Sequence, residues 1–197
     1  GPGVDESQRT GSFGHFRARR RPTGPCRSRA LRSADPMPRL SAGIVAFRRT
    51  ATGVEVLVAH PGGPMWARRD DGAWTIPKGL ADEGETDLLA VARREFAEET
   101  GHPAPDGPYI DLGEVRLRSG KVVRAWAAEG DLDPATAHSN EFDLEWPVGS
   151  GRIVRVPEID RVAWMAPDDA RRALNPIQAE LVDRLLAGID AAPEEAG

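Results

Sequence analysis

The segment from Lys78 to His102, KGLADEGETDLLAVARREFAEETGH, constrains this chain more than any other. It places Glu95, Glu98 and Glu99 at the spacing i, i+3, i+4, which brings side chains to one edge of a helix. Like charges at that spacing destabilise a helix by roughly 0.2–0.5 kcal/mol even in solvent. The segment is therefore either a solvated charged helix or a place where a positive group is bound.

The same segment predicts where such a helix begins and ends. Thr86 or Asp87 is a suitable N-cap, and Gly101 stands where a helix would stop. At about 100° per residue, one face is apolar and the three glutamates fall on the neighbouring edge, at the border between core and solvent. The apolar face is predicted to consist of Leu88, Leu89, Ala92 and Phe96.

A hard divalent cation would resolve the repulsion between these carboxylates. Mg²⁺ prefers carboxylate oxygens and retains water molecules that can react. The alternative is an ordinary acidic helix surface on which Arg94 partly pairs with Glu98. The glutamates alone do not decide between these two interpretations.

The rest of the chain from residue 40 onward predicts short strands and helices around one sheet, an α/β or α+β sandwich. Pro167 opens a short helix, and Asn175-Pro176 is expected to cap a last one with Ile177, Leu181 and Leu185 on one face. The predicted strands are 40–49, 54–60, 109–117, 121–130 and 158–166, with a brief one at AWTIP (73–77).

Composition bounds the domain organisation. A chain of 197 residues, 40% apolar and 29% charged, suits one globular domain, expected here at residues 37–190. Residues 1–36 carry eight arginines against three acidic residues and show no periodicity, so we expect disorder there, and also at 191–197. Gly1-Pro2 resembles the remnant of a cleaved expression tag. A nucleic-acid-binding arm and an organelle transit peptide are the alternatives for residues 1–36.

Charge, hydropathy and cysteine content limit the cellular compartment and the kinds of binding partner that we expect for this chain. No apolar run approaches the roughly 20 residues that span a bilayer, so no membrane partner is expected. Cys26 is the single cysteine, which excludes an internal disulfide and fits a reducing compartment such as the cytoplasm. The net charge of −5 argues against a folded part that binds nucleic-acid backbones. A monomer or a homodimer is expected.

The segment resembles the signature of the Nudix hydrolase superfamily. Its positions are filled by Gly79, Glu85, Arg94, Glu95, Phe96, Glu98, Glu99 and Gly101. WTIPKG before it and EIDRVAWM after it also resemble that superfamily. Eight residues separate Glu85 from Arg94 where the pattern has seven, and we expect the extra one at the junction of loop and helix. The resemblance implies an α/β/α sandwich around a mixed sheet, with the signature in a loop–helix–loop.

The resemblance also implies a mechanism, the hydrolysis of a nucleoside diphosphate linked to another group. Glu95, Glu98 and Glu99 would hold Mg²⁺ or Mn²⁺, with a backbone carbonyl of Lys78 or Gly79 as a further ligand. Arg94 would brace the glutamates, Lys78 would reach a substrate phosphate, and Glu95 would accept the proton from water.

A long Gly/Pro-rich loop precedes the signature and suggests where a nucleotide could bind. Trp66 could stack on a base and Arg69 could bind phosphate oxygens, with His60 at the start of the loop. The alternative is that Trp66 simply packs the loop.

The nucleotide itself is left open by the sequence. The region from Leu117 to Val122 lacks the proline or tyrosine that marks certain Nudix subfamilies. A small-molecule substrate such as a (d)NTP or a dinucleoside polyphosphate is expected. Two alternatives are a catalytically weak nucleotide-binding or regulatory module and an RNA-directed, decapping-type hydrolase.

Overall fold

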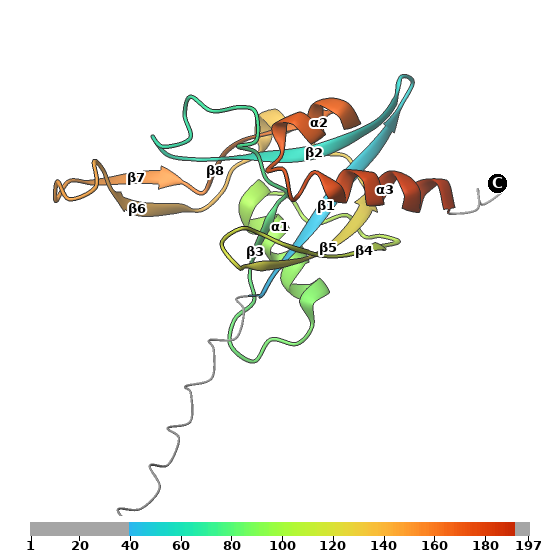
Figure 1. Ribbon diagram of the computed structural model, residues 1–197, viewed down its shortest axis with the longest axis horizontal. Coiled ribbons are helices and arrows are strands. Elements are labelled where there is room, and N and C mark those ends of the chain that lie inside the picture. Colours follow the sequence, from blue (N-terminus) through green and yellow to red (C-terminus); the bar gives the residue numbers. More distant parts are fainter. Residues whose placement is uncertain (1–39, 192–197) are drawn as a thin grey trace, which may run out of the picture. The chain divides into compact units, whose positions relative to one another are not determined.

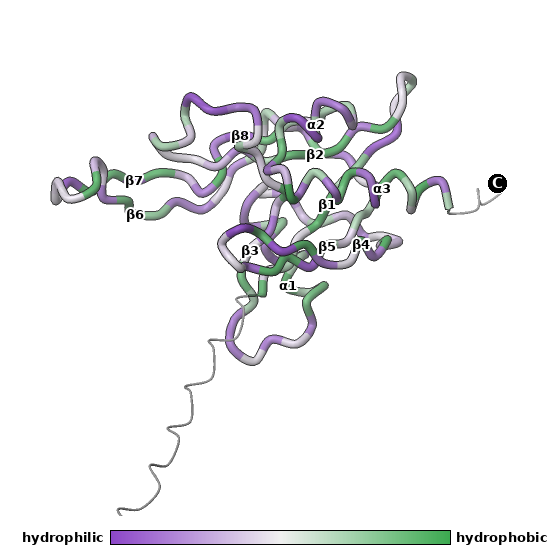
Figure 2. The backbone as a smooth tube through the Cα atoms, in the orientation of Figure 1, coloured by the Kyte–Doolittle hydropathy of each residue, from purple (hydrophilic) through white to green (hydrophobic). Residues whose placement is uncertain are grey.

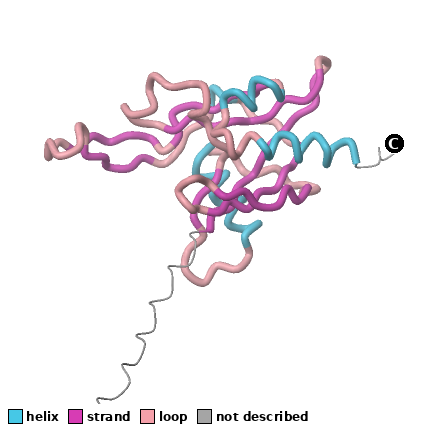
Figure 3. Tube along the Cα trace, in the orientation of Figure 1, coloured by secondary structure: helices cyan, strands magenta, loops and turns pink. Residues whose placement is uncertain are grey.

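The computed structural model describes residues 40–191, all of which belong to the unit formed by residues 36–197. The expectations for residues 1–36 and for residues 192–197 lie outside the described part of the chain. The described residues form eight strands, three α-helices and one short 3-10 helix. Figures 1 and 3 show how the strands and helices are arranged. In chain order these are β1 (Leu40–Thr50), β2 (Gly53–Pro61), β3 (Lys78–Leu80), α1 (Leu88–Thr100), β4 (Ile110–Arg116), β5 (Val122–Glu129), η1 (Pro134–Thr136), β6 (Glu141–Glu145), β7 (Ile153–Pro157), β8 (Ile159–Met165), α2 (Pro167–Ala173) and α3 (Glu180–Ala191).

The main sheet is mixed. Its strand order is β4-β5-β1-β2-β8, with β3 also paired to β1. The β1–β5 pair is parallel, whereas the pairs β1–β2, β1–β3, β2–β8 and β4–β5 are antiparallel. A side chain at Gly43 would place its Cβ 2.6 Å from the Pro77 carbonyl oxygen, so glycine permits the close approach of β1 and the segment that enters β3.

Alternation along the central strands gives the sheet two apolar faces, as expected for a strand buried on both sides. In β1, Ala42, Ile44 and Ala46 belong to one core cluster, whereas Val45 and Phe47 belong to the other. Figure 2 shows hydrophobic residues along these strands.

Helices cover both faces, which gives the expected α/β/α sandwich (Figure 1). Helix α1 packs on the first face through Val91, Ala92 and Phe96. Helices α2 and α3 pack on the second, where Leu181 and Leu185 are fully buried. Within residues 40–191, no helix is both long and apolar enough to cross a membrane.

A separate two-stranded sheet, β6–β7, was not predicted. Its alternation of acidic and apolar residues, EFDLE, is a strand pattern that could have been recognised. The loop after β2 packs on it, because a Cβ at Gly63 would contact Val156 and Leu144. Trp146 follows β6, is only partly buried and belongs to neither core cluster.

Two other element predictions need correction. AWTIP forms only isolated bridges, Ala59–Thr75 and Trp74–Leu174, and the strand begins at Lys78 instead. The last helix begins at Glu180, because a turn follows Asn175, whose side chain accepts a hydrogen bond from the Ile177 N–H at 3.1 Å. The predicted strand pairs and α2 are confirmed.

Candidate active site

Helix α1 has the ends that its sequence predicts. Asp87 is the N-cap, and its side chain accepts a hydrogen bond from the Ala90 N–H at 3.1 Å. Gly101 ends the helix in the left-handed region, at φ 72°, and its N–H donates to the Ala97 carbonyl. These caps fix the register of the segment REFAEE between them.

The glutamates of α1 differ in exposure because the buried face is rotated relative to the predicted one. Val91 is buried whereas Leu89 is only partly buried, a correction to the predicted face. Glu99 consequently points inward and is 9% exposed. The Glu95 side chain is 12% exposed and that of Glu98 is 41% exposed. The three carboxylates therefore run from the core edge to solvent.

Strand β3 lies directly against the two inner glutamates. The Lys78 N–H donates a hydrogen bond to Glu99 Oε2 at 2.8 Å. A Cβ at Gly79 would lie 1.7 Å from Glu95 Oε2, so only glycine leaves that carboxylate in its place. The pair Lys78-Gly79 is thus shaped around the acidic edge of α1.

Arg94 braces the acidic cluster from the solvent side. Its Nη2 lies 3.0 Å from Glu85 Oε2, and its Nη1 lies 3.2 Å from Glu95 Oε1 and 3.9 Å from Glu98 Oε1. Glu85 also accepts a hydrogen bond from the Asp82 N–H at 2.7 Å. The extra residue between Glu85 and Arg94 therefore leaves the Glu85–Arg94 ion pair intact.

The inner carboxylates carry more negative charge than the protein compensates. Burial, with the charges of Glu95 and Glu158, raises the pKa of Glu99 from 4.5 to about 7 against the opposing effect of Lys78. Burial also raises the pKa of Glu95, where Arg94 opposes the shift and other carboxylates reinforce it. Raised pKa values in neighbouring carboxyl groups indicate a place suited to a cation or to proton transfer.

Glu158, the first residue of the segment EIDRVAWM, belongs to this electrostatic group, although it was not among the predicted site residues. It lies between β7 and β8, and its charge raises the pKa of both Glu95 and Glu99. Its N–H donates to the Asn140 carbonyl, and its own carbonyl accepts from the Gly62 N–H. The segment EIDRVAWM does not by itself predict that this carboxylate lies near α1, since only the fold brings it there.

The donor chemistry of this site fits a hard divalent cation, because carboxylate oxygens predominate. The side-chain placement is not yet that of a formed metal centre. Among residues 40–191, no three His, Cys, Asp or Glu side chains are grouped so that they could hold a metal ion. Two of the candidate oxygens, on Glu95 and Glu98, instead face Arg94.

The predicted substrate-binding residues of the loop lie apart from this group. The Arg69 guanidinium lies over the Trp66 ring, 5.6 Å from its centre. Trp66 packs against the core beneath α2 and α3. The contacts found within residues 40–191 do not join either residue to the glutamates of α1.

His60 cannot contact a substrate directly in this structure, which corrects its expected role. Its side chain is fully buried and both ring nitrogens are bonded within the protein. It therefore acts, if at all, through the loop that it holds.

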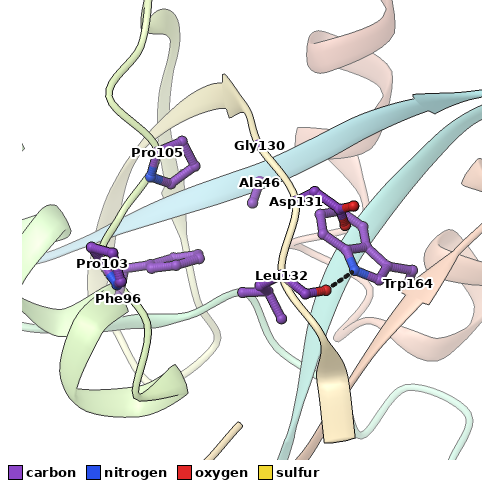
Figure 4. A pocket seen from close by; sticks show the side chains of 8 residues that line it. All are labelled: Ala46, Phe96, Pro103, Pro105, Gly130, Asp131, Leu132 and Trp164. Atoms are coloured by element: carbon purple, nitrogen blue, oxygen red, sulfur yellow. Dashed lines mark hydrogen bonds between the residues drawn. The ribbon is translucent and has the colours of Figure 1, made fainter. Parts of the chain in front are cut away.

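Three hollows near the site differ in size and charge. A cavity of about 60 Å³ beside the C-terminal end of α1 is too small for a nucleoside (Figure 4), and Arg48 binds Asp131 on its rim. It is lined by Ala46, Phe96, Pro103, Pro105, Gly130, Asp131, Leu132 and Trp164.

A hollow of about 310 Å³ between the loop and α2 is large enough for a ligand, but Asp70, Asp71 and Asp169 line it and disfavour phosphate. A recess of about 10 Å³ adjoins Glu99 and is lined partly by His138, Asp160 and Arg161. None of these hollows by itself has the size and charge for a nucleotide.

Comparison with known proteins places these features in a family context. The NUDIX domain family model matches residues 37–185. An RNA pyrophosphohydrolase of Caulobacter vibrioides is 51% identical over 132 residues, which covers 54% of this chain and 74% of that protein. An 8-oxo-(d)GTP phosphatase of Mycolicibacterium smegmatis is 42% identical over 85 residues, covering 41% of this chain. The match spans only 24% of the length of the mycobacterial protein.

Solved structures agree in fold. The Ap4A hydrolase of C. elegans superposes with a TM-score of 0.54 at 21% identity, covering 77% of this chain and 99% of that one. The NUDIX domain of Shewanella oneidensis NrtR, complexed with ADP ribose, gives a TM-score of 0.56 at 18% identity, covering 79% and 91%. At these identities the likeness shows the fold alone.

Proposed function

Because this chain belongs to the Nudix hydrolase superfamily, we propose that it hydrolyses a phosphoric anhydride bond in a nucleotide with the help of a divalent cation. The substrate class is a nucleoside diphosphate linked to another group. The observation that carries this proposal is the packing of Glu95 and Glu99 against Lys78-Gly79, where burial and the repulsion of neighbouring carboxylates raise both carboxyl pKa values.

Glu95, Glu98 and Glu99 are the proposed ligands of Mg²⁺ or Mn²⁺, with a carbonyl of Lys78 or Gly79 as a further donor. Such a cation screens the phosphate charge and lowers the pKa of a bound water. Because Glu95 and Glu98 face Arg94 here, we expect these side chains to turn away from the guanidinium when the cation binds.

The protein's own groups would prepare the site. The Lys78 N–H orients the Glu99 carboxylate, and the Lys78 ammonium supplies positive charge for a substrate phosphate. Arg94 ties the loop residue Glu85 to α1 and so holds the edge of the site together. Glu95 is the proposed proton acceptor, and Glu158 is a second candidate because it lies close enough to influence the same carboxylates.

The test is hydrolysis of a nucleotide panel by the whole chain in Mg²⁺ and in EDTA. The panel comprises dGTP, 8-oxo-dGTP, diadenosine tetraphosphate, ADP-ribose and 5′-triphosphorylated RNA. We expect Mg²⁺-dependent release of phosphate, pyrophosphate or a mononucleotide from at least one of them. Absence of any product, at enzyme concentrations approaching that of the substrate, would contradict the proposal and favour a nucleotide-binding module.

RNA is a second candidate substrate, since the relative that is 51% identical is named an RNA pyrophosphohydrolase. Eight arginines in residues 1–36 could add salt-dependent affinity for an RNA backbone. Deleting residues 1–36 separates the two candidates. If the deletion lowers activity on the RNA substrate alone, RNA is favoured. If the deletion leaves activity on both RNA and free nucleotides as it is in the whole chain, the small molecules are favoured.

The oligomeric state and the compartment remain proposals. A monomer or a homodimer acting in the cytoplasm is consistent with the composition described above.

A further inference from the structure

His60, near the end of β2, is surrounded by hydrogen-bond acceptors. Its ring is fully buried and lies edge-on to Trp74, with 5.0 Å between ring centres. Nδ1 lies 2.8 Å from Asp160 Oδ1 on β8, and Nε2 lies 2.8 Å from the Arg69 carbonyl oxygen on the loop.

Both bonds can form only if the His60–Asp160 pair carries two protons. A carbonyl oxygen and a carboxylate both accept, whereas a neutral imidazole has a single N–H. Arg161 Nη1 lies 3.7 Å from Asp160 Oδ1, a contact that a carboxylate can make as an ion pair. With both protons on the ring, the pair is an imidazolium facing a carboxylate. A neutral imidazole beside an ionised Asp160 has one N–H for two acceptors. At either Nδ1 or Nε2 a nitrogen lone pair would then face an oxygen lone pair.

The Arg69 contact fixes a turn of the loop. The Arg69 N–H donates to the Trp66 carbonyl at 2.8 Å, and the Trp66 N–H donates to the Gly63 carbonyl at 3.1 Å. The buried His60 bond thus ties the whole Gly63–Arg69 turn to β2. Outside it, the Arg161–Asp70 ion pair is largely exposed and contributes little.

We propose that His60, protonated on both ring nitrogens, is a positioning residue that holds the Trp66–Arg69 turn ready for substrate. This proposal rests on the proposed function and on the substrate-binding role that the sequence predicts for Trp66 and Arg69. When the pair loses one proton, the remaining ring N–H stays with the carboxylate, the stronger acceptor. The Arg69 carbonyl then loses its partner and the turn is released.

Glu99 and His138 line the same recess as Asp160, so a pH effect is assigned to His60 through its own ring N–H signals. Asp160 and Arg161 face it from β8, and Asp70 meets Arg161 from the loop. Trp74, which faces its ring, carries no titratable group.

The first test is ¹H–¹⁵N NMR of the His60 ring and the loop amides in the full chain as the pH is raised. We expect two ring N–H groups at low pH, then one on Nδ1, with the Trp66 and Arg69 amide signals shifting at the same midpoint. A single ring N–H throughout, with the loop amides unchanged, would overturn the proposal. This readout does not depend on enzymatic activity.

The second test is the pH profile of KM and kcat in Asp160→Asn, using the panel nucleotide with the highest kcat/KM. The side-chain amide of this variant can donate to Nδ1, so a neutral ring could then give its one N–H to the Arg69 carbonyl. We expect wild-type KM to rise about tenfold at alkaline pH with little change in kcat, the effect of one net hydrogen bond. The rise should be absent in Asp160→Asn, and an equal rise in that variant would overturn the proposal.

His60→Phe removes both bonds while keeping a buried ring. We expect a raised KM at every pH with little change in kcat, provided that the variant folds. Asp70→Asn is the matched control, because it removes the exposed ion pair with Arg161 and leaves the Arg161–Asp160 contact and the His60–Arg69 bond in place. If no nucleotide in the panel is hydrolysed, the proposed function fails. The NMR result still decides whether doubly protonated His60 holds the Trp66–Arg69 turn.

Discussion

Glu99 is the residue at which burial and charge conflict most strongly. It is nearly buried, receives one backbone hydrogen bond, and has other carboxylates nearby. A buried ionisable group without a counter-charge lowers stability, and such groups are expected at functional sites. The conflict is resolved if a cation binds when the carboxylate is ionised.

We predict that, without divalent cations, the free energy of unfolding falls as the pH rises from about 4.5 to about 7. The pKa of Glu99 is raised from 4.5 to about 7 in the folded protein, so the folded state binds more protons than the unfolded state between these values. Across that window the free energy of unfolding should decrease by up to about 3 kcal/mol. Urea unfolding in EDTA at pH 5 and pH 8 measures this change.

Glu99→Gln is the control for that experiment. The amide does not titrate, so most of the loss between pH 5 and pH 8 should disappear. The same loss in the variant as in the wild type would show that another group causes it.

Gly79 gives a second prediction at the residue scale. In Gly79→Ala the new Cβ would overlap the Glu95 carboxylate, which must move aside. Because that carboxylate ends a flexible side chain, we expect stability to change by less than about 1 kcal/mol while kcat falls at least about tenfold. Leu80→Ala, on the exposed neighbour, is the control and should keep its kcat.

At the scale of elements, α1 and β3 together form the site, and α1 was the more predictable of the two. Asp87, Gly101 and the i, i+3, i+4 glutamates act within a few residues of one another, so the sequence predicted them. The positions of β3 and Glu158 depend on pairing between distant segments. The segment EIDRVAWM contains Glu158 and Asp160, but it does not predict their contacts. The His60–Asp160 pair joins residues 100 apart in sequence.

The N-cap of α1 can be tested directly. Asp87→Ala removes the acceptor of the Ala90 N–H and should lower the free energy of unfolding by about 1 kcal/mol. Thr86→Ala, at the other N-cap candidate from the sequence, should change it by less than about 0.5 kcal/mol. Chemical denaturation of both variants decides between them, and a larger loss in Thr86→Ala would contradict the observed cap.

At the scale of the whole molecule, the turn before α3 supports the segment that enters the active site. Gln178 is 2% exposed, and its Oε1 accepts hydrogen bonds from the Ile76 N–H at 2.9 Å and from Thr75 Oγ1 at 3.0 Å. Gln178, on the side of the sheet opposite α1, thus holds Thr75 and Ile76, the residues just before the segment Pro77–Gly79. The sequence showed the apolar face of the last helix but not this inward-pointing glutamine.

We predict that Gln178→Ala weakens both stability and catalysis. It leaves the buried Ile76 N–H without its acceptor, which should cost about 1–3 kcal/mol. Since Ile76 lies two residues before Lys78, kcat should fall as well. Glu180→Ala, which removes an exposed ion pair with Arg184, should change stability by less than about 0.5 kcal/mol and leave kcat unchanged. Unaltered turnover in Gln178→Ala would show that this support does not reach the site.

The proposed mechanism depends most on a cation bound among the glutamates of α1. Titration of the whole chain with Mn²⁺, followed by electron paramagnetic resonance, measures this binding directly. We predict saturable binding that Mg²⁺ displaces, weakened at least about tenfold in Glu99→Gln and unchanged in Glu83→Gln, which removes the same charge from the exposed loop. Equal Mn²⁺ affinity in the wild type and in Glu99→Gln would contradict the proposed metal site and the mechanism built on it.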